Sequence, residues 1–485
     1  MIKLKLFFLF NLFLVQTTFA QSWTADSLDF QQFLDLSIDE HFGLELARLE
    51  YNKTEMQYQA IQTEFKPQLS VSGVLPNYSK SSTPVTQPDG SISFQPISYD
   101  NSRIGVSAQQ NIGATGGFLF MNSSMNRYQD FGSNQKSYYS KPLRLGFYQP
   151  LWGYNDLKRQ LDLATLKKSV AQQVFDSDKV DLEAEICLVF FNILRSQYDL
   201  DLAKKNVNSA KALHAIAAEK YKLGKISKRD LIQLDLELQN EQQGLLNAQT
   251  NLETAKVQGL AGLGINPEST AWDLRTPEEW RSIQINEKTA FDAFSSNRRE
   301  HKDLLVQMET ATQNLDRIKA NYGHEVAISA SIGFVNTANS LPEAYQQLQN
   351  EQFVQVNFSL PIFDWGRKKK NMEVAAIEKK QTLVQAQQDI IKLKTNLFQY
   401  IDAFHSIQEQ LNISKSITDM AIENYTINEK SYQAGAINLN DVTLARQQRD
   451  QILRQHLNLL AQYWTIYYQI RALCLYDFFE QKTLK

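Results

Sequence analysis

Apolar residues recur every seven positions along two long stretches that contain neither glycine nor proline. The stretches run from Tyr154 to Leu223 and from Arg367 to Ala434, which is 70 and 68 residues. Helix interiors disfavour both missing residue types, and each stretch could form one helix of about 100 Å. The repeat in the second stretch is Leu383, Ile390, Leu397, Phe404 and Leu411. The pattern predicts long helices packed as coiled coils.

Upstream of each long stretch the period of the pattern changes to two. Val354, Val356 and Phe358 alternate with polar residues, and Leu143, Leu145 and Phe147 occupy the positions 211 residues earlier. Such alternation is typical of half-buried strands in a soluble sandwich, and also of transmembrane barrel strands with lipid on one side and water on the other.

The first twenty residues favour the barrel. Lys3 and Lys5 precede the apolar run Leu6–Val15, and Thr18-Phe19-Ala20 offers small residues for cleavage. This is the pattern of a signal peptide, too short to span a bilayer. We therefore expect export, and removal of the two lysines changes the net charge from −3 to −5.

The chain reads as an internal duplication with an offset of 211 residues. Tyr221-Lys222-Leu223-Gly224 corresponds to Tyr432-Gln433-Ala434-Gly435, and Asp230 corresponds to Asp441. A glycine at this point ends one helix, and Ser227 or Asn438 followed three residues later by aspartate begins the next. Each half is therefore expected to contain a long helix, a tight turn and a shorter helix.

The predicted organisation has five parts. They are a signal peptide over residues 1–20, a first repeat over 21–263, a connector over 264–286, a second repeat over 287–476 and a tail over 477–485. Strands are expected within 67–150 and 325–361, and helical hairpins over 154–263 and 367–476.

The first half holds 47 residues more than the second between corresponding landmarks. Pro76–Asp100 is rich in Pro, Ser and Asp and is predicted to be a loop. Arg103–Asn126 reads as a hairpin around a glycine-rich turn, which could add membrane strands or stand outside the membrane. The expected barrel strands amount to two strand pairs per chain, which cannot close a barrel alone, so several copies of the chain must share it.

Composition and motifs offer no catalytic chemistry. The six histidines form no metal-ligand spacing, so neither a metal site nor a cofactor is expected. The near-neutral net charge does not indicate binding to nucleic acid. The basic run Arg367–Lys370 is interpreted as a helix face in contact with water. Cys187 and Cys474 lie among apolar residues and read as small core side chains.

The duplicated motifs resemble the TolC family of outer-membrane efflux proteins over nearly all of the mature chain. The motifs are the strand-to-helix junctions Gln149-Pro150-Leu151-Trp152 and Leu360-Pro361-Ile362-Phe363, and the turns around Gly224 and Gly435. The resemblance implies an α+β membrane protein in which each repeat has helix, strand, strand, long helix and short helix. It also implies that three copies form one transmembrane β-barrel, continued by a periplasmic α-helical coiled-coil barrel.

The resemblance also implies where partners bind. In the family the helical turns form the periplasmic mouth, where an adaptor docks and acidic rings select cations. Asp441 matches the first acidic position of the family, whereas Leu444 occupies the second. Asp230 and Asp441 fit equally well as helix caps, and Tyr221 and Tyr432 as packing residues. The implied strand-to-helix junction residues are Pro150, Trp152, Pro361 and Phe363.

Two functions remain in view. The first is a homotrimeric outer-membrane conduit of a tripartite efflux or type I secretion system, without enzymatic activity of its own. Its implied partners are a periplasmic adaptor, outer-membrane lipid and an inner-membrane pump of the RND, ABC or MFS type. The alternative is a trimeric coiled-coil adhesin or structural surface protein. Strands before both hairpins favour the conduit, because adhesins usually carry one barrel segment at the C-terminus.

Overall fold

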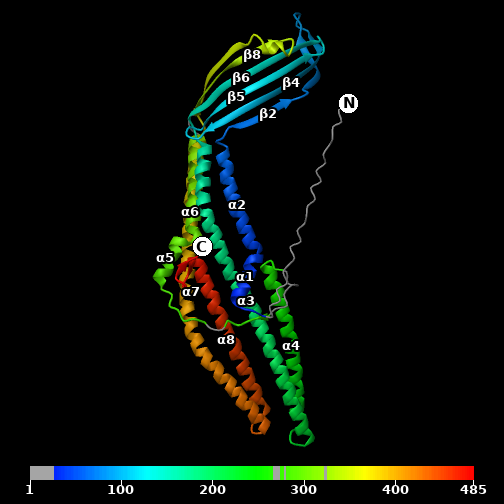
Figure 1. Cartoon of the computed structure of the whole chain (residues 1–485), viewed down its shortest axis with the longest axis vertical. Coiled ribbons are helices and arrows are strands. Elements are labelled where there is room, and N and C mark those ends of the chain that lie inside the picture. Colours follow the sequence, from blue (N-terminus) through cyan, green and yellow to red (C-terminus); the bar gives the residue numbers. More distant parts are fainter. Residues whose placement is uncertain (1–26, 266–272, 278–279, 322–324, 485) are drawn as a thin grey trace. The chain divides into compact units, whose positions relative to one another are not determined.

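A computed structural model describes residues 27–265, 273–277, 280–321 and 325–484 (Figure 1). The predicted signal peptide lies outside the described residues, as does part of the predicted connector. The chain divides into two compact units. One unit, here called the turn unit, comprises residues up to 43, 182–283 and 403–468. The other, here called the sheet unit, comprises residues 44–181, 284–402 and 469–485.

Both glycine- and proline-free stretches form single helices, as predicted. They are α3 (Asp156–Lys222) and α7 (Arg367–Ala434), with 67 and 68 residues. Each ends in a short turn and is followed by a helix of about half its length, α4 (Lys228–Gly262) or α8 (Leu439–Cys474). The predicted helical hairpins are therefore present, and both long helices pass from the sheet unit into the turn unit.

Shorter helices and strand pairs complete the chain. The other helices are α1 (Phe30–Glu40), α2 (Phe42–Thr63), α5 (Glu287–Asn297), α6 (Arg299–Asn321) and the 3-10 turn η2 (Glu343–Tyr345). Two minor sheets join β1 (Ser27–Leu28) to β7 (Asp273–Leu274) and β10 (Tyr476–Asp477) to β11 (Lys482–Thr483).

The sheet unit contains one seven-stranded antiparallel sheet with the order β2-β4-β5-β6-β8-β9, in which β3 also pairs with β4 (Figure 1). Its strands are β2 (Gln68–Val74), β3 (Tyr78–Thr86), β4 (Ile92–Ile112), β5 (Gly117–Asp130), β6 (Gln135–Trp152), β8 (Glu325–Ala338) and β9 (Gln349–Ser359). β2 pairs with the second half of β4 and β3 with its first half. Together β2 and β3 thus follow most of the length of β4.

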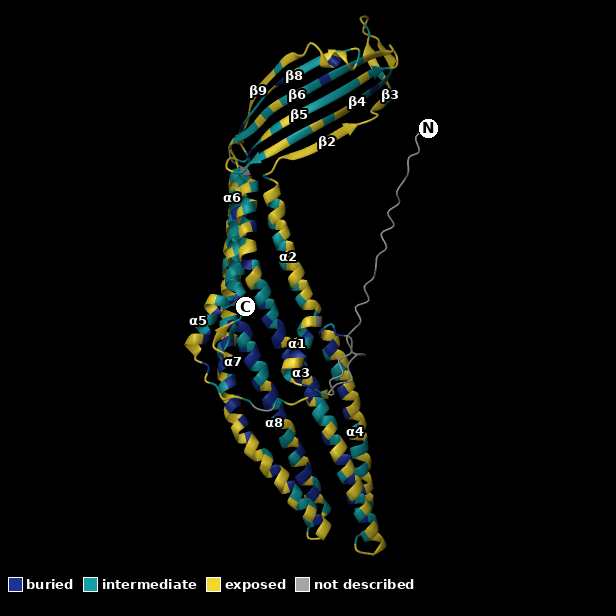
Figure 2. Cartoon of the chain, viewed as in Figure 1, coloured by how far each residue is buried: buried dark blue, intermediate teal, exposed yellow. Residues whose placement is uncertain are grey.

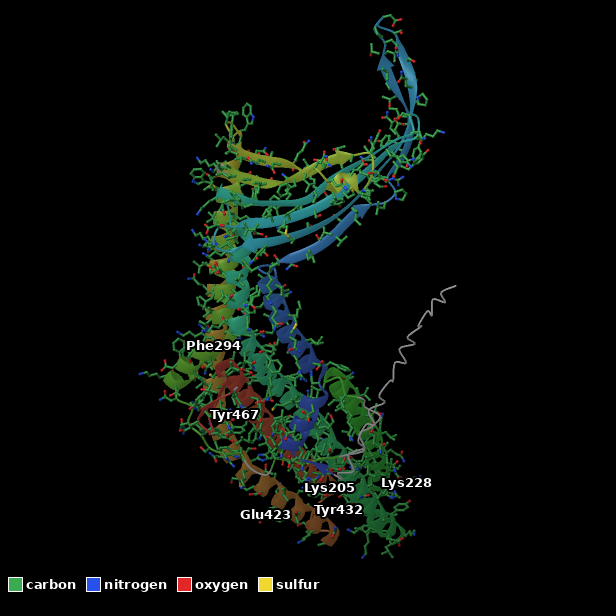
Figure 3. All side chains as sticks on the ribbon, turned by 45° about the horizontal axis from the view of Figure 1, so that its top comes forward. Lys205, Lys228, Phe294, Glu423, Tyr432 and Tyr467 are labelled. Carbon is green, nitrogen blue, oxygen red and sulfur yellow. The ribbon has the colours of Figure 1, made fainter. Side chains whose placement is uncertain are left out.

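Two predictions about the first half of the sheet were wrong. Pro76–Asp100 is not a loop, because β3 and the first half of β4 form a hairpin that projects from the sheet (Figure 3). Pro84 lies in β3, and Pro96 lies in the part of β4 that precedes its pairing with β5. Each proline therefore sits in a strand segment with one unpaired side, where the missing N–H is tolerated. The count of two strand pairs per chain was also wrong. Arg103–Asn126 lies in β4 and β5, inside the main sheet, so the path across it has six strand positions.

Strand register sorts the side chains onto an apolar and a polar face. Leu69, Ala108, Met121, Leu145 and Ile332 follow one another across five strands. The next row, on the opposite face, is Ser70, Ser107, Asn122, Arg144, Gly333 and Glu351. Most of the sheet is intermediate or exposed in the single chain (Figure 2), and on its apolar face Ile332 is exposed by 57% and Val356 by 56%. An amphipathic sheet of this size requires a cover for its apolar face.

The turn unit has an aromatic core. Phe404 stacks on Tyr463 with ring centroids 4.9 Å apart, and Phe190 lies edge-on to Phe30 at 5.0 Å. Cys187 is fully buried in this unit, as expected for a small core side chain.

Candidate functional site

The two helical turns have the same backbone structure. Gly224 has φ +69° and Gly435 has φ +78°, so both adopt the left-handed conformation expected from the sequence. The Gly224 N–H donates to the Tyr221 carbonyl at 2.8 Å, and the Lys225 N–H to the Lys220 carbonyl at 2.8 Å. The second turn repeats both bonds at Tyr432 and Ser431. Each long helix therefore ends in the same six-to-one arrangement, which satisfies its last carbonyl groups.

The aspartates after the turns act as helix caps. The Asp230 N–H donates to Ser227 Oγ at 3.2 Å, and the Ser227 N–H donates back to Asp230 Oδ2 at 3.1 Å. The hydrogen bonds from Ser227 lower the pKa of Asp230. In the second turn the Asp441 N–H donates to Asn438 Oδ1 at 3.1 Å, and the return bond from Asn438 N–H is longer, at 3.4 Å. Asp441 is thus the more loosely held of the two carboxylates.

The equivalent tyrosines have different environments. Tyr432 is 8% exposed and packs with Leu213, Ala217, Leu234, Tyr425, Val442 and Ala445. The ammonium group of Lys220 lies 5.2 Å from the centre of its ring. Tyr221 is 40% exposed and Leu444 is 56% exposed. Tyr432 therefore joins the two hairpins, whereas Tyr221 and Leu444 remain on the surface.

The two turns also differ in charge. Residues 220–230 contain five cations (Lys220, Lys222, Lys225, Lys228 and Arg229) and one anion, Asp230. The corresponding residues 431–441 contain no cation and one anion, Asp441. Lys222, Lys225, Lys228 and Arg229 are exposed, and Leu223 between them is 69% exposed. The α3–α4 turn therefore presents a basic surface that the α7–α8 turn lacks.

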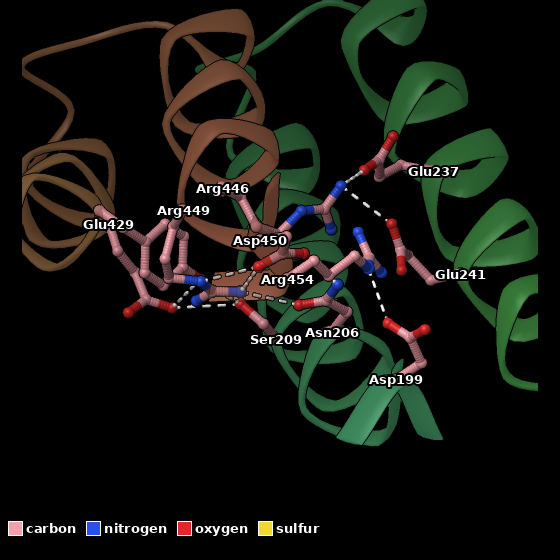
Figure 4. A network of polar contacts seen from close by, with 11 residues as sticks. Asp199, Asn206, Ser209, Glu237, Glu241, Glu429, Arg446, Arg449, Asp450 and Arg454 are labelled. Atoms are coloured by element: carbon pink, nitrogen blue, oxygen red, sulfur yellow. Dashed lines mark hydrogen bonds and ion pairs between the residues drawn. The ribbon is translucent and has the colours of Figure 1, made fainter. Parts of the chain in front are cut away.

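A polar network joins the two hairpins within the turn unit (Figure 4). Arg446 of α8 is 5% exposed and pairs with Glu237 and, at 3.0 Å, with Glu241 of α4. Asn206 of α3 donates to Asp450 of α8 at 2.6 Å. Burial, opposed by the Arg446 charge, raises the pKa of Glu241. Because these charges are desolvated, their pairing matters more than that of surface ions.

The network continues toward the surface on both sides. The Arg449 guanidinium lies 4.0 Å from the centre of the Tyr425 ring, and the Tyr425 hydroxyl donates to Glu429 at 3.1 Å. Arg454 pairs with Asp199 at 2.7 Å, but both side chains are nearly half exposed. None of these residues was predicted from the sequence. The sequence pattern that could have located them is three arginines on α8 at spacings of three and five residues. By itself this pattern is typical of a helix face in contact with water.

The strand-to-helix junction residues lie where the sheet meets the long helices. Pro150 is in β6 and Trp152 is its last residue, four residues before α3 begins. Pro361 and Phe363 lie between β9 and α7. Phe363 and Trp152 are 71% and 63% exposed. The Asp364 carboxylate accepts the Lys368 N–H at 2.8 Å and so caps the start of α7. The junction thus places exposed aromatic rings beside the end of the apolar face.

No catalytic or metal centre emerges among the residues that the structure describes. Within them, no three His, Cys, Asp or Glu side chains form a group able to hold a metal ion. In the same residues, no helix is both long and apolar enough to cross a membrane.

The sequence of residues 295–474 matches the family of outer membrane efflux proteins. No curated protein matches the chain in sequence. Its fold is similar to that of the Campylobacter jejuni CmeC outer membrane channel, with 16% identity, TM-score 0.68 and coverage of 92% of this chain and 85% of that one. It is also similar to the outer membrane protein VceC of Vibrio cholerae, with 14% identity, TM-score 0.66 and coverage of 92% and 95%. CusC, described as forming a transmembrane channel, aligns with 13% identity, TM-score 0.64 and coverage of 93% and 94%.

Proposed function

We propose that the chain is an outer membrane efflux protein, located in the outer membrane, and that it is the channel of a tripartite efflux or type I secretion system. The match of residues 295–474 to the outer membrane efflux protein family supports this proposal. The channel is a passive conduit. It provides a water-filled path, and an inner-membrane pump of the RND, ABC or MFS type provides the energy through a periplasmic adaptor. The family is one of efflux proteins and not of enzymes.

One observation supports the conduit above all. The same chain combines a sheet with one apolar and one polar face with two helices of 67 and 68 residues that continue from its strands. The apolar face is suited to lipid and the polar face to water, as in transmembrane barrels. The edges of such a sheet cannot stay unpaired in lipid, so we propose that three copies share one barrel.

We place the adaptor contact at the two helical turns. Exposed Tyr221, Leu223 and Leu444 offer apolar contacts there, and the four exposed cations around Gly224 suit an acidic partner surface. The buried network around Arg446 would then hold the two hairpins together in the closed channel, so that opening the mouth requires those ion pairs to separate.

Conductance tests this function directly. We expect purified protein to have the native mass of a trimer and to open water-filled pores in a planar bilayer. An adhesin-like stalk would give the same mass without conductance. A monomer that conducts would contradict the shared barrel, and a trimer that never conducts under voltage or after removal of the Arg446 network would contradict the conduit.

A further inference from the structure

The sheet has more strand positions than the resemblance implies. Two strands in each repeat would give four per chain, whereas the path from β2 to β9 has six. The additional pair is not a separate hairpin on the surface. β4 pairs with β5 over fourteen residues, from Tyr99–Ile112 against Gly117–Asp130, and β5 pairs with β6 over nearly its full length. The extra strands are therefore integral to the sheet.

Both edges of the sheet end in strands suited to each other. β2 leads away from the end of α2, and β9 runs toward the start of α7, so both have an end on the side of the sheet nearest these helices and their directions are opposite. In both strands the apolar side chains point to the same face of the sheet. Leu69 and Val71 of β2 lie on the apolar face together with Val356 and Phe358 of β9. Ser70 and Asn357 lie on the polar face.

The strand ends are displaced in a regular way across the sheet. The paired row that begins at Gln68, the first residue of β2, passes through Gln109, Phe120, Gly146 and Ser331 and reaches Phe353. Phe353 lies six residues before Ser359, the end of β9. The path from β2 of one chain to β2 of the next would cross five strand spacings within the sheet and a sixth at the junction between the chains. With Gln68 of the next chain opposite Ser359, a displacement of six residues of about 3.3 Å over six spacings of about 4.8 Å corresponds to a strand tilt of about 35°. Barrel strands tilt by about 35–45°, so this register across the junction gives the tilt that a closed barrel needs.

We propose that β9 of one chain pairs with β2 of the next, and that three chains close a barrel of eighteen strands. The pairing sets Leu69 against Phe358, Ser70 against Asn357 and Val71 against Val356. A shift by one residue would exchange the two faces, and a shift by two toward the start of β9 would reduce the tilt to about 25°. The inference rests on the proposed function, because it takes the sheet to be the membrane barrel.

The consequence concerns the width of the path. Barrel diameter grows roughly in proportion to the number of strands. Eighteen strands give a barrel about half as wide again as the twelve that three copies of a four-stranded chain would form. The barrel is then less able to limit the size of the cargo than a barrel of twelve strands would be.

Cysteine pairs across the junction test the inference. Ser70→Cys with Asn357→Cys places both thiols on the water side, and a short bifunctional thiol reagent should convert the chain to a covalent trimer in a denaturing gel. Ser72→Cys with Gln355→Cys is a second matched pair, in case the first assembles poorly. The control, Ser70→Cys with Val356→Cys, puts the thiols on opposite faces and should stay monomeric. Native Cys187 and Cys474 are fully buried and should not react.

The outcomes are distinct. Ser107 is the partner of Ser70 within the sheet, with their hydroxyl oxygens 2.7 Å apart. Cross-linking of Asn357→Cys to Ser107→Cys, in place of either matched pair, would show that β2 lies outside the barrel and would overturn the count of eighteen. Failure of both matched pairs in a conducting trimer would also overturn it while leaving the proposed function intact. Loss of the trimer and of conductance in the unmodified protein would instead contradict the proposed function.

Discussion

Gly224 and Gly435 adopt a left-handed conformation that residues with a Cβ reach only with strain, whereas Gly244 lies inside α4 with nothing near the position of its missing Cβ. The same substitution should therefore have opposite signs at these sites. We expect Gly224→Ala or Gly435→Ala to destabilise its turn by about 1 kcal/mol and Gly244→Ala to stabilise α4 by about 0.5–1 kcal/mol. Hydrogen exchange of the flanking amides measures both. Equal protection in all three variants would mean that the turns do not need glycine.

Asp441 is the residue at which capping and gating can be separated. Its carboxylate accepts only a long hydrogen bond, 3.4 Å from the Asn438 nitrogen, so Asp441→Asn should change the melting temperature of the assembly little. If three copies meet at a narrow mouth, their charges attract cations, and block of single channels by a trivalent cation should weaken in Asp441→Asn. Persistent block together with a lower melting temperature would instead identify a cap with no part in selectivity.

The elements show how far sequence reasoning reaches. The absence of glycine and proline predicted both ends of α7 without error and both ends of α3 to within two residues. It did so because only helices exclude both residue types over such lengths. The alternation of apolar and polar residues with a period of two predicted the strands β6, β8 and β9. The β3–β4 hairpin escaped prediction because Pro84 and Pro96 read as loop residues, although edge pairing accommodates them. The Arg446 network was not predicted, because a charged residue buried between helices gives the same sequence pattern as a charged residue in contact with water.

The strength of the ion pairs that link the two hairpins depends on how far they are buried. Two arginines of α8, one buried and one half exposed, therefore provide a matched pair of variants. Arg446 has 7% of its side chain exposed and holds two glutamates, whereas Arg454 has 48% exposed and holds Asp199. Arg446→Met leaves two partly buried carboxylates without a counter-charge, at a cost of about 3–5 kcal/mol, but Arg454→Met removes a surface pair worth at most about 1 kcal/mol. We expect only Arg446→Met to increase channel conductance. If both variants conduct alike, the network does not hold the mouth closed.

For the whole molecule, the assignment of one sheet face to lipid has the widest consequences, and adjacent residues of β4 test it. Val106 lies on the apolar face, 41% exposed in the single chain, and Ser107 lies on the polar face. A lysine facing lipid near the middle of the membrane costs about 2–4 kcal/mol, whereas one facing the lumen costs little. Val106→Lys should therefore reduce folding into lipid vesicles, measured by urea titration, and lower the amount of trimer in the outer membrane.

Ser107→Lys should fold and insert like the unmodified protein, because its ammonium group stays in water. Its three added charges should also repel cations and shift the ion selectivity of the open channel toward anions. The two variants thus distinguish a residue that faces lipid from one that faces the lumen, by placing the same side chain at adjacent positions of one strand. If Val106→Lys inserts as well as Ser107→Lys, the apolar face is covered by protein rather than by lipid. The long helices would then continue from a soluble sandwich instead of a membrane barrel, and the conduit would have no path through the outer membrane.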